Sequence, residues 1–194
     1  SAHAAEAPFD WLEAALPPRH VRSEAQVELQ QFSTPPVLAW LMAKAAAVSA
    51  HDTLLEPSAG NGALALWGSV QNASLILNEI DPARRDSLVH IFPAATITAH
   101  DGELIADLLR GAAPSVVLMN PPFARSQERG KDGETAQRHL RSAIRSAAAG
   151  ARIVAILPNG FDACTFAEAQ DEASLLLNVR LQQAFRRTGT GIAV

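Results

Sequence analysis

The chain has 194 residues, of which 48% are hydrophobic, and it carries a formal net charge of −4 with a mean hydropathy of +0.05. This length suits one α/β domain with a full core, and no apolar run is long enough to span a bilayer. The N-terminus lacks the basic and apolar regions of a signal peptide, and the single cysteine, Cys164, excludes an internal disulfide, so we expect a cytoplasmic protein. The acidic balance is unlike that of most free-standing duplex binders, although arginines grouped within 19–22, 125–145 and 180–187 could contact phosphates.

The N-terminal part of the chain predicts two helices separated by prolines. The helical spacing of Phe9, Leu12 and Leu16 predicts a short amphipathic helix that Pro17-Pro18 ends. The stretch Gln30-Gln31-Phe32-Ser33-Thr34-Pro35-Pro36 then leads into a second helix, with Thr34 as its N-cap and a proline at its first position. The predicted apolar face of this second helix consists of Val37, Leu38, Leu41, Met42 and Val48.

The next stretch predicts a strand, a tight turn and a helix. Thr53 to Leu55 are β-prone, and the apolar spacing beyond Gly62 is helical. Between them stand Glu56-Pro57-Ser58-Ala59-Gly60-Asn61-Gly62, an acid followed by small residues. Glycine has no Cβ, so the backbone of such a turn can approach a ligand closely, but the dinucleotide fingerprint G-x-G-x-x-G is absent. The carboxylate suits a ligand with a cationic amine and hydroxyls, and it would repel a phosphate.

The second predicted strand also ends in an acid. Leu75-Ile76-Leu77-Asn78 leads into Glu79-Ile80-Asp81-Pro82, and Pro82 starts a helix. An acid at the tip of the second strand stands where a ribose would present its two hydroxyls, and this is the role we expect of Glu79. For Asp81 we expect stabilisation of the dipole of the following helix.

Two more strands follow. One, over 96–99, runs into His100-Asp101-Gly102, a common turn pair in which His100 is expected to be structural, and a helix over 103–110 comes next. The other, over 115–119, is apolar throughout and therefore expected to be buried on both faces. It ends in Asn120-Pro121-Pro122-Phe123.

The remainder continues the alternation of helices and strands. The polar, glycine-containing stretch 124–134 is predicted to be a mobile loop, and helices and strands are then predicted in turn over 136–148, 153–157, 166–177 and 179–185. Such alternation predicts a parallel sheet with right-handed crossovers and helices on both faces. Ile192-Ala193-Val194 begins an apolar run that stops, so we expect an α/β domain truncated at its last strand.

Taken in chain order, these stretches resemble motifs X, I, II, III and IV of the γ class of adenine-N6 DNA methyltransferases, which use S-adenosylmethionine (SAM). The resemblance covers residues 31–160 and implies a Rossmann-like SAM-dependent methyltransferase fold, with SAM as cofactor and no metal. It implies that the segment from Phe32 to Pro35 closes over the methionine end of SAM, that Ile80 lies against the adenine and that Asp101 accepts from the adenine amino group. The cofactor-binding residues are then expected to be Phe32, Thr34, Pro35, Glu56, Pro57, Ser58, Ala59, Gly60, Gly62, Glu79, Ile80, Asp101 and Gly102.

Amine methylation explains the residue types at Asn120-Pro121-Pro122-Phe123, which are the candidate catalytic residues. The exocyclic nitrogen of adenine is a poor nucleophile because its lone pair is delocalised into the ring. The side-chain oxygen of Asn120 and the main-chain carbonyl of Pro121 could accept both amino hydrogens and aim the lone pair at the methyl group. Phe123 offers an aromatic face for a base flipped out of the duplex, a contact worth roughly 1–3 kcal/mol.

More closely, the four strings Q-Q-F-S-T-P-P, L-E-P-S-A-G-N-G, L-N-E-I-D-P and V-L-M-N-P-P-F resemble the methylase-like domain of strawberry-notch-type helicase proteins of bacterial mobile elements. This resemblance implies that residues 1–35 form an N-terminal helix and motif X segment and residues 36–194 the catalytic domain, within a larger protein. Nothing after Phe185 can supply a base-reading domain. We therefore expect DNA as partner, with specificity supplied by other parts of the parent protein, no membrane partner, and a monomeric fragment.

Two alternatives stay open. The N-P-P-F motif also occurs in enzymes that methylate guanine-N2 in RNA or glutamine side chains in proteins. These nitrogens are planar as well, and their lone pairs are delocalised in the same way. The chain could also be a non-catalytic module that binds SAM or DNA within a helicase-type protein.

Overall fold

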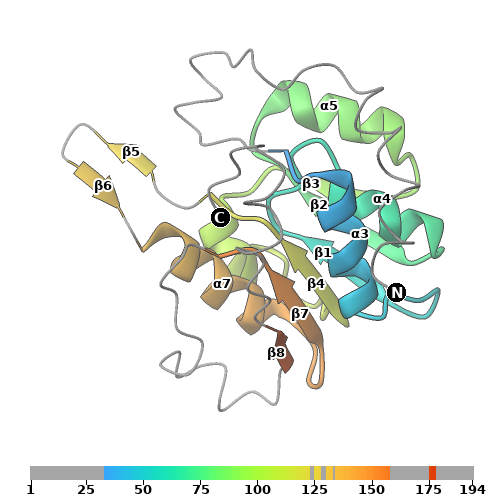
Figure 1. Cartoon of the computed structure of the whole chain (residues 1–194). Coiled ribbons are helices and arrows are strands. Elements are labelled where there is room, and N and C mark those ends of the chain that lie inside the picture. Colours follow the sequence, from blue (N-terminus) through green and yellow to red (C-terminus); the bar gives the residue numbers. More distant parts are fainter. Residues whose placement is uncertain (1–32, 123–124, 128–129, 133, 158–174, 178–194) are drawn as a thin grey trace, which may run out of the picture.

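The computed structural model describes residues 33–122, 125–127, 130–132, 134–157 and 175–177 (Figure 1). Within these residues, six strands form one sheet in the order β3-β2-β1-β4-β7-β8. All five neighbouring pairs of this sheet are parallel, so the predicted parallel sheet is confirmed. The strands are β1 (Thr53–Glu56), β2 (Ser74–Asn78), β3 (Thr96–Thr98), β4 (Val116–Met119), β7 (Arg152–Ala155) and β8 (Leu175–Leu177).

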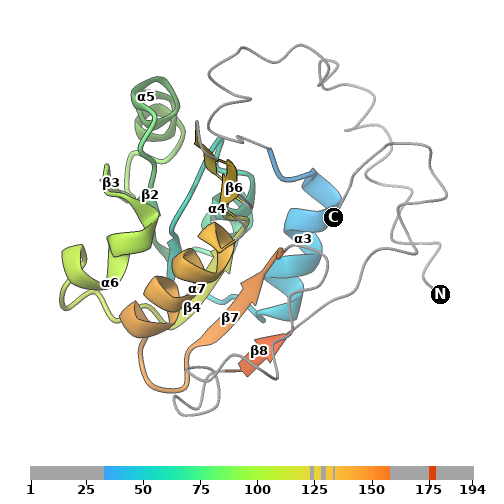
Figure 2. The ribbon, with the colours of Figure 1, turned by 90° about the vertical axis from the view of Figure 1, so that its left-hand side faces the viewer.

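Helices cover both faces of the sheet, as predicted. Figure 2 shows α3 and α7 on opposite sides of the central strands. The described helices are α3 (Pro36–Ala45), α4 (Ala63–Val70), α5 (Pro82–Ile91), the 3-10 turn η2 (Gly102–Leu104), α6 (Ile105–Leu108) and α7 (Thr135–Ser146).

The core has two layers because successive strand residues point to opposite faces. Leu54 and Leu55 are neighbours in β1, and both are fully buried. Leu54 belongs to the cluster that packs under α3, α4 and α5, whereas Leu55 belongs to the cluster under α6 and α7. All four residues of β4 are buried, as expected of a central parallel strand that is covered on both sides.

The start of α3 differs from the prediction. A proline is its first residue, as expected, but this proline is Pro36 and not Pro35, because Pro35 is the N-cap, and no side chain caps the helix. Thr34 is therefore not the N-cap; its hydroxyl instead accepts a hydrogen bond from Asn120. Leu41 was expected on the apolar face but is 38% exposed, because the helix turns other residues toward the core. These buried residues are Leu38, Ala39, Met42 and Ala43.

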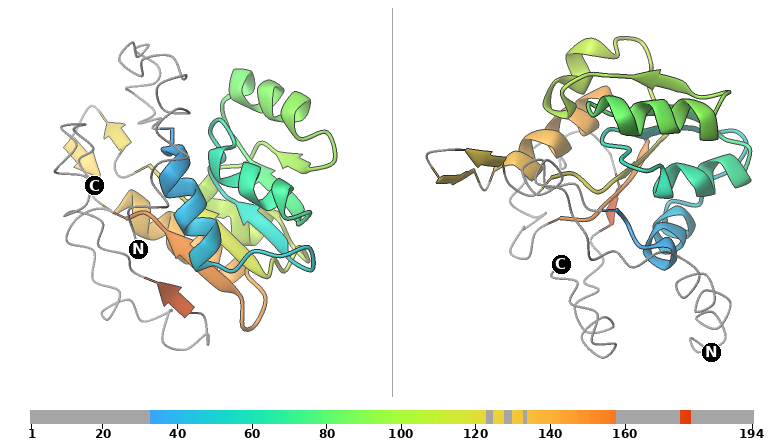
Figure 3. Two further views of the ribbon diagram at one scale, coloured as in Figure 1. Left: turned by 45° about the vertical axis from the view of Figure 1, so that its right-hand side comes forward. Right: turned by 90° about the horizontal axis from the view of Figure 1, so that it is seen from above.

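Two further predictions were wrong. The stretch predicted to be a mobile loop contains an antiparallel pair, β5 (Arg125–Gln127) and β6 (Gly130–Asp132), which extends away from the sheet (Figures 1 and 3). The two strands are two residues apart, a usual hairpin spacing that the polar composition obscured. Residues 175–177 form β8 instead of the end of a helix, because pairing with the open edge of β7 outweighs the helix propensity of leucine. The helix predicted over 8–16 and the strand predicted over 179–185 lie outside the described residues.

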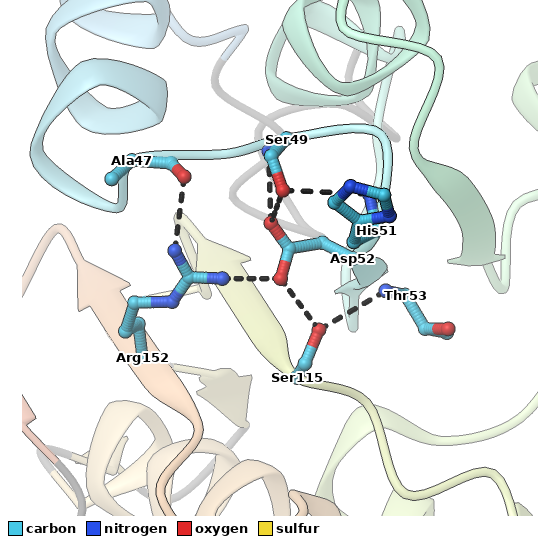
Figure 4. Close-up of polar contacts among 7 residues, drawn as sticks. All are labelled: Ala47, Ser49, His51, Asp52, Thr53, Ser115 and Arg152. Atoms are coloured by element: carbon cyan, nitrogen blue, oxygen red, sulfur yellow. Dashed lines mark hydrogen bonds and ion pairs between the residues drawn. The ribbon is translucent and has the colours of Figure 1, made fainter.

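At the amino ends of the central strands, Asp52 ties three segments together (Figure 4). Its Oδ1 accepts from the Ser115 hydroxyl at 2.8 Å and from the Arg152 guanidinium, and its Oδ2 accepts from the main-chain N–H and the hydroxyl of Ser49 at 2.8 and 2.9 Å. Arg152 also donates to the carbonyl of Ala47 at 2.9 Å. Burial opposes ionisation of Asp52, but the bonds from Ser115 and Ser49 and the charge of Arg152 outweigh it and lower the pKa of this carboxyl.

Candidate functional site

The predicted site residues stand at the opposite edge of the sheet, where the parallel strands end. Strand β1 pairs with β2 on one side and with β4 on the other, so the strand order reverses direction at β1. In open α/β sheets, ligands bind at the carboxyl ends of the strands beside such a reversal. Glu56 ends β1, Glu79 follows β2 and Asn120 follows β4, so all three leave the same edge.

The Glu56 side chain is only 2% exposed, and it points at the first turn of α4. Its Oε2 accepts a hydrogen bond from the main-chain N–H of Ala65 at 3.0 Å. Burial raises the pKa of the Glu56 carboxyl well above its usual range, the bond from Ala65 acts in the opposite direction, and the nearby charge of Glu79 raises the pKa further. A cation bound nearby would stabilise the ionised form of this carboxyl.

The two glycines of the turn have different structural reasons. Gly62 is the N-cap of α4, with a φ of +78°. A Cβ there would lie 2.5 Å from Phe92 and 2.9 Å from Leu88, so α5 packs directly against it. Gly60 also has a positive φ of +57°, but a Cβ there would meet only a guanidinium nitrogen of Arg84 at 3.4 Å. Gly62 therefore has a packing reason, and the prediction that glycine gives a ligand room to approach stays a prediction at both positions.

The Glu79 carboxylate joins the turn after β1 to the turn after β2. Its Oε2 accepts from the N–H of Gly60 at 2.7 Å and its Oε1 from the N–H of Asp81 at 2.8 Å. Burial raises the pKa of Glu79, although these two bonds and the charge of Arg84 act in the opposite direction. The neighbouring Ile80 is 54% exposed, so its side chain is accessible beside the buried carboxylate. Asp81 stands at the N-terminus of α5, as expected, and its side chain also caps the helix by accepting from the N–H of Arg84 at 3.0 Å.

Asn78 is a site residue that the sequence analysis missed. It is buried, and its amide makes four hydrogen bonds. Its Nδ2 donates to the carbonyls of Pro57 and His100, each at 2.9 Å, while its Oδ1 accepts from the Thr98 hydroxyl and the His100 N–H, each at 2.8 Å. The amide therefore joins the ends of β1, β2 and β3. An asparagine between an apolar strand and an acid was the available signal.

The remaining turn residues of the first strand are close-packed. Pro57 and Ala59 are buried and Ser58 is half-buried. The N–H of Ala59 donates to the carbonyl of Asn78 at 2.8 Å, which holds the turn against β2.

Asp101 and Gly102 start the 3-10 turn η2. The Oδ1 of Asp101 accepts from the N–H of Glu103 at 3.0 Å and so caps this turn. Gly102 is buried, and a Cβ there would lie 2.6 and 2.7 Å from the Cδ2 and Nε2 atoms of His139. Glycine at this position therefore lets α7 pack close to the third strand tip. The role of both residues toward a cofactor stays a prediction.

The structure brings together two predicted site residues that are 86 positions apart. The Nδ2 of Asn120 donates a hydrogen bond to the Oγ1 of Thr34 at 3.2 Å. Thr34 and Pro35 are buried, as is Pro121, while Asn120 and Pro122 are half-buried. Phe32 and Phe123, predicted to contact cofactor and base, lie outside the described residues.

Among the described residues, no group of three metal-ligating side chains is present, and no helix is long and apolar enough to cross a membrane.

No protein-family model matches the chain, and no curated protein matches it. Among solved structures, it resembles PH1948 of Pyrococcus horikoshii, described as an RNA methyltransferase, with a TM-score of 0.52 and 19% identity over 73% of this chain and 70% of that one. TrmN of Thermus thermophilus gives 0.54 and 19% over 66% of this chain. A modification subunit described for a type I restriction enzyme of Vibrio vulnificus YJ016 gives 0.59 and 16% over 82% of this chain. The chain matches only 40% of the length of each of the last two proteins.

The matches also include the CurF ER cyclopropanase of the curacin A biosynthetic pathway, with a TM-score of 0.53 and 14% identity over 82% of this chain and 48% of that one. At these identities the comparisons establish the fold, a Rossmann-like α/β domain that methyltransferases share with other enzymes. The activity must be argued from the site itself.

Proposed function

We propose that this chain is the core of a SAM-dependent methyltransferase that transfers a methyl group to the exocyclic N6 of adenine in DNA. One observation carries the proposal: two buried carboxylates, Glu56 and Glu79, and the amide of Asn120 stand at the carboxyl ends of three adjacent parallel strands. The carboxylates suit a cationic cofactor, and the amide suits an amino substrate beside it.

The charge of the cofactor fits the first two strand ends. SAM carries a sulfonium and an amino group against one carboxylate, so its net charge is positive. Burial disfavours the ionised forms of Glu56 and Glu79, and a cation in their neighbourhood relieves that cost. The carboxylate of Glu79 retains lone pairs that could accept ribose hydroxyls in addition to the N–H of Gly60. The exposed Ile80 offers an apolar surface for the adenine of the cofactor.

At the end of β4, Asn120 and Pro121 supply the acceptors for an amino group. When the Asn120 Oδ1 and the Pro121 carbonyl accept its hydrogens, the nitrogen lone pair is directed at the methyl carbon. The nitrogen–carbon bond forms as the carbon–sulfur bond breaks, its electrons stay on sulfur as a neutral thioether, and one amino proton leaves to water. Positioning of this kind can supply several kcal/mol of the barrier without an acid, base or metal.

Two features support adenine in DNA over other planar nitrogens. These are the order of the five motifs and the F-x-T-P segment ahead of β1. A second candidate, methylation of RNA or of a protein amide, would use the same acceptors. It is retained because the matched structures include a protein described as an RNA methyltransferase.

The test offers tritiated SAM to the chain with DNA, RNA and protein in parallel. Label in DNA at adenine N6 is the expected result, and label in RNA or protein alone would overturn the DNA assignment. Asn120→Ala should abolish the transfer. Gln71→Ala is the matched control, because Gln71 is an exposed amide residue at the far end of α4. Equal transfer by wild type and Asn120→Ala would remove Asn120 from the reaction, and no transfer by the folded wild type would favour a non-catalytic module.

A further inference from the structure

We propose that Thr34 is a positioning residue for Asn120: its hydroxyl holds the amide so that Oδ1 faces the methyl acceptor. This arrangement restricts the acceptor to nitrogens that carry N–H donors. The inference rests on the proposed function and deepens it by naming what sets the orientation of the catalytic amide.

The backbone and side-chain conformations of Thr34 are tightly restricted. This residue is 7% exposed, and it is followed by Pro35 and Pro36, whose rings fix their own backbone angles and restrict the residue before them to extended conformations. Threonine is also stiff about its first side-chain torsion. Its hydroxyl has no task in the helix that follows, because no side chain caps α3. The hydroxyl is therefore available to Asn120.

The Asn120 amide needs a fixed hydrogen-bond partner to keep one orientation. The torsion angle that rotates an asparagine amide has a broad, roughly two-fold distribution. An amide without a fixed partner can therefore rotate so that its oxygen and nitrogen swap positions. Here Nδ2 donates to the Oγ1 of Thr34 at 3.2 Å, and among the described residues Oδ1 accepts no hydrogen bond. The acceptor end of the amide is thus the end left for a ligand.

The chemical consequence concerns the substrate. An amide that turned Nδ2 toward an amino group would set one donor against another and would not hold the nitrogen. With Nδ2 engaged by Thr34, the amide accepts an N–H from the substrate and cannot favour a nitrogen that has only a lone pair to offer. Amino and primary amide nitrogens meet this condition, whereas ring nitrogens without a hydrogen do not.

The experiment uses the whole chain and three variants. Thr34→Val keeps the shape of the side chain and removes the hydroxyl, and Thr34→Ser keeps the hydroxyl. Thr96→Val makes the same chemical change at an exposed position at the start of β3. For each protein, calorimetry gives the dissociation constant of SAM, and a single-turnover assay at saturating SAM gives the rate of methyl transfer. The side-chain amide signals of Asn120 in a nitrogen–proton spectrum report its hydrogen bond without turnover.

We expect Thr34→Val to lower the rate at saturating SAM about tenfold, the scale of one lost hydrogen bond, with a much smaller change in SAM affinity. Thr34→Ser should restore most of the rate, Thr96→Val should match wild type, and only Thr34→Val should shift the Asn120 amide signals. Wild-type rates in Thr34→Val, or a loss confined to SAM affinity, would overturn the inference while leaving the proposed function intact. A folded wild type that methylates nothing would refute the proposed function, and the inference with it.

Discussion

The Oε2 atom of Glu79 lies 2.7 Å from the main-chain nitrogen of Gly60, so the acid after β2 holds the glycine turn after β1 in place. The same carboxylate also accepts from the N–H of Asp81. The residue expected to bind the ribose therefore also organises the two turns between which a ribose would lie.

Replacing Glu79 should weaken cofactor binding for two separate reasons. In Glu79→Ala, a ligand loses its acceptor and the N–H groups of Gly60 and Asp81 lose their partner. We expect SAM affinity to fall by about 1–3 kcal/mol, measured by calorimetry. Asp86→Ala, which removes an exposed acid from α5, is the control and should bind as wild type. Unchanged affinity in Glu79→Ala would contradict the ribose assignment.

Cofactor binding should release protons at mildly acidic pH. Burial raises the pKa values of Glu56 and Glu79. In the free protein these carboxyls therefore keep part of their protons at pH values above the ordinary pKa of a glutamate. A cation bound beside them lowers both pKa values and expels protons. Titrating SAM at about pH 5.5, above the ordinary glutamate pKa of about 4.3, in buffers of different ionisation enthalpy should give buffer-dependent heats. The neutral analogue 5′-methylthioadenosine should release fewer protons, and equal heats in all buffers for SAM would argue against the predicted cation site.

Asp52 should make the stability of the fold sensitive to acid. The pKa of this carboxyl is lowered in the folded state, so its contribution is present above the unfolded pKa of about 3.9 and is lost as pH falls through the folded value. Asp52→Asn should lower the free energy of unfolding by about 1–3 kcal/mol at pH 7 and by less below pH 3.9, as measured with urea. The exposed Asp107 pairs with Arg145 at 4.0 Å, and Asp107→Asn should change stability little. If the loss of unfolding free energy in Asp52→Asn were as large in acid as at pH 7, the stability contribution would not depend on ionisation of Asp52.

Asn78 should be important for the strand tips as a unit. Asn78→Leu retains the approximate volume but leaves the carbonyls of Pro57 and His100 and the donors of Thr98 and His100 without their partner. We expect the free energy of unfolding to fall by about 2–4 kcal/mol, because buried polar groups lose their hydrogen bonds. A change below about 0.5 kcal/mol would show that the four bonds do not support the fold.

The strands of the fold were predictable because their signals are local. Leu54-Leu55 and the run Val116–Met119 are apolar and β-prone, and each is followed by an acid or a proline-bearing turn. Strand β8 was missed because its pairing with β7 is a tertiary contact that leucine composition does not reveal. The antiparallel pair β5–β6 was missed because polar, glycine-containing strands have the composition of a loop.

The site was predictable by residue type and less so by contact. Thr34 has the residue type and proline context of a helix cap, yet its partner is Asn120, a relation between distant segments that no local pattern contains. Gly62 and Gly102 are predicted to contact the ligand, and the structure adds a packing reason for both, because a Cβ at either position would meet a neighbouring side chain at less than 3.0 Å. Asn78 was passed over because four hydrogen bonds from one amide become visible only when three strand ends are assembled.

Calorimetric titration with SAM tests most directly whether this fold binds SAM at the carboxyl ends of β1 and β2. Ile80→Asp places a charge at a 54% exposed position expected to contact the adenine, and Val89→Asp makes the same kind of change at a 50% exposed position on α5. We predict a dissociation constant on the order of micromolar for wild type and Val89→Asp, and at least about tenfold weaker binding for Ile80→Asp, which corresponds to about 1.4 kcal/mol. No binding by the folded wild type, or equal binding by all three proteins, would contradict the account.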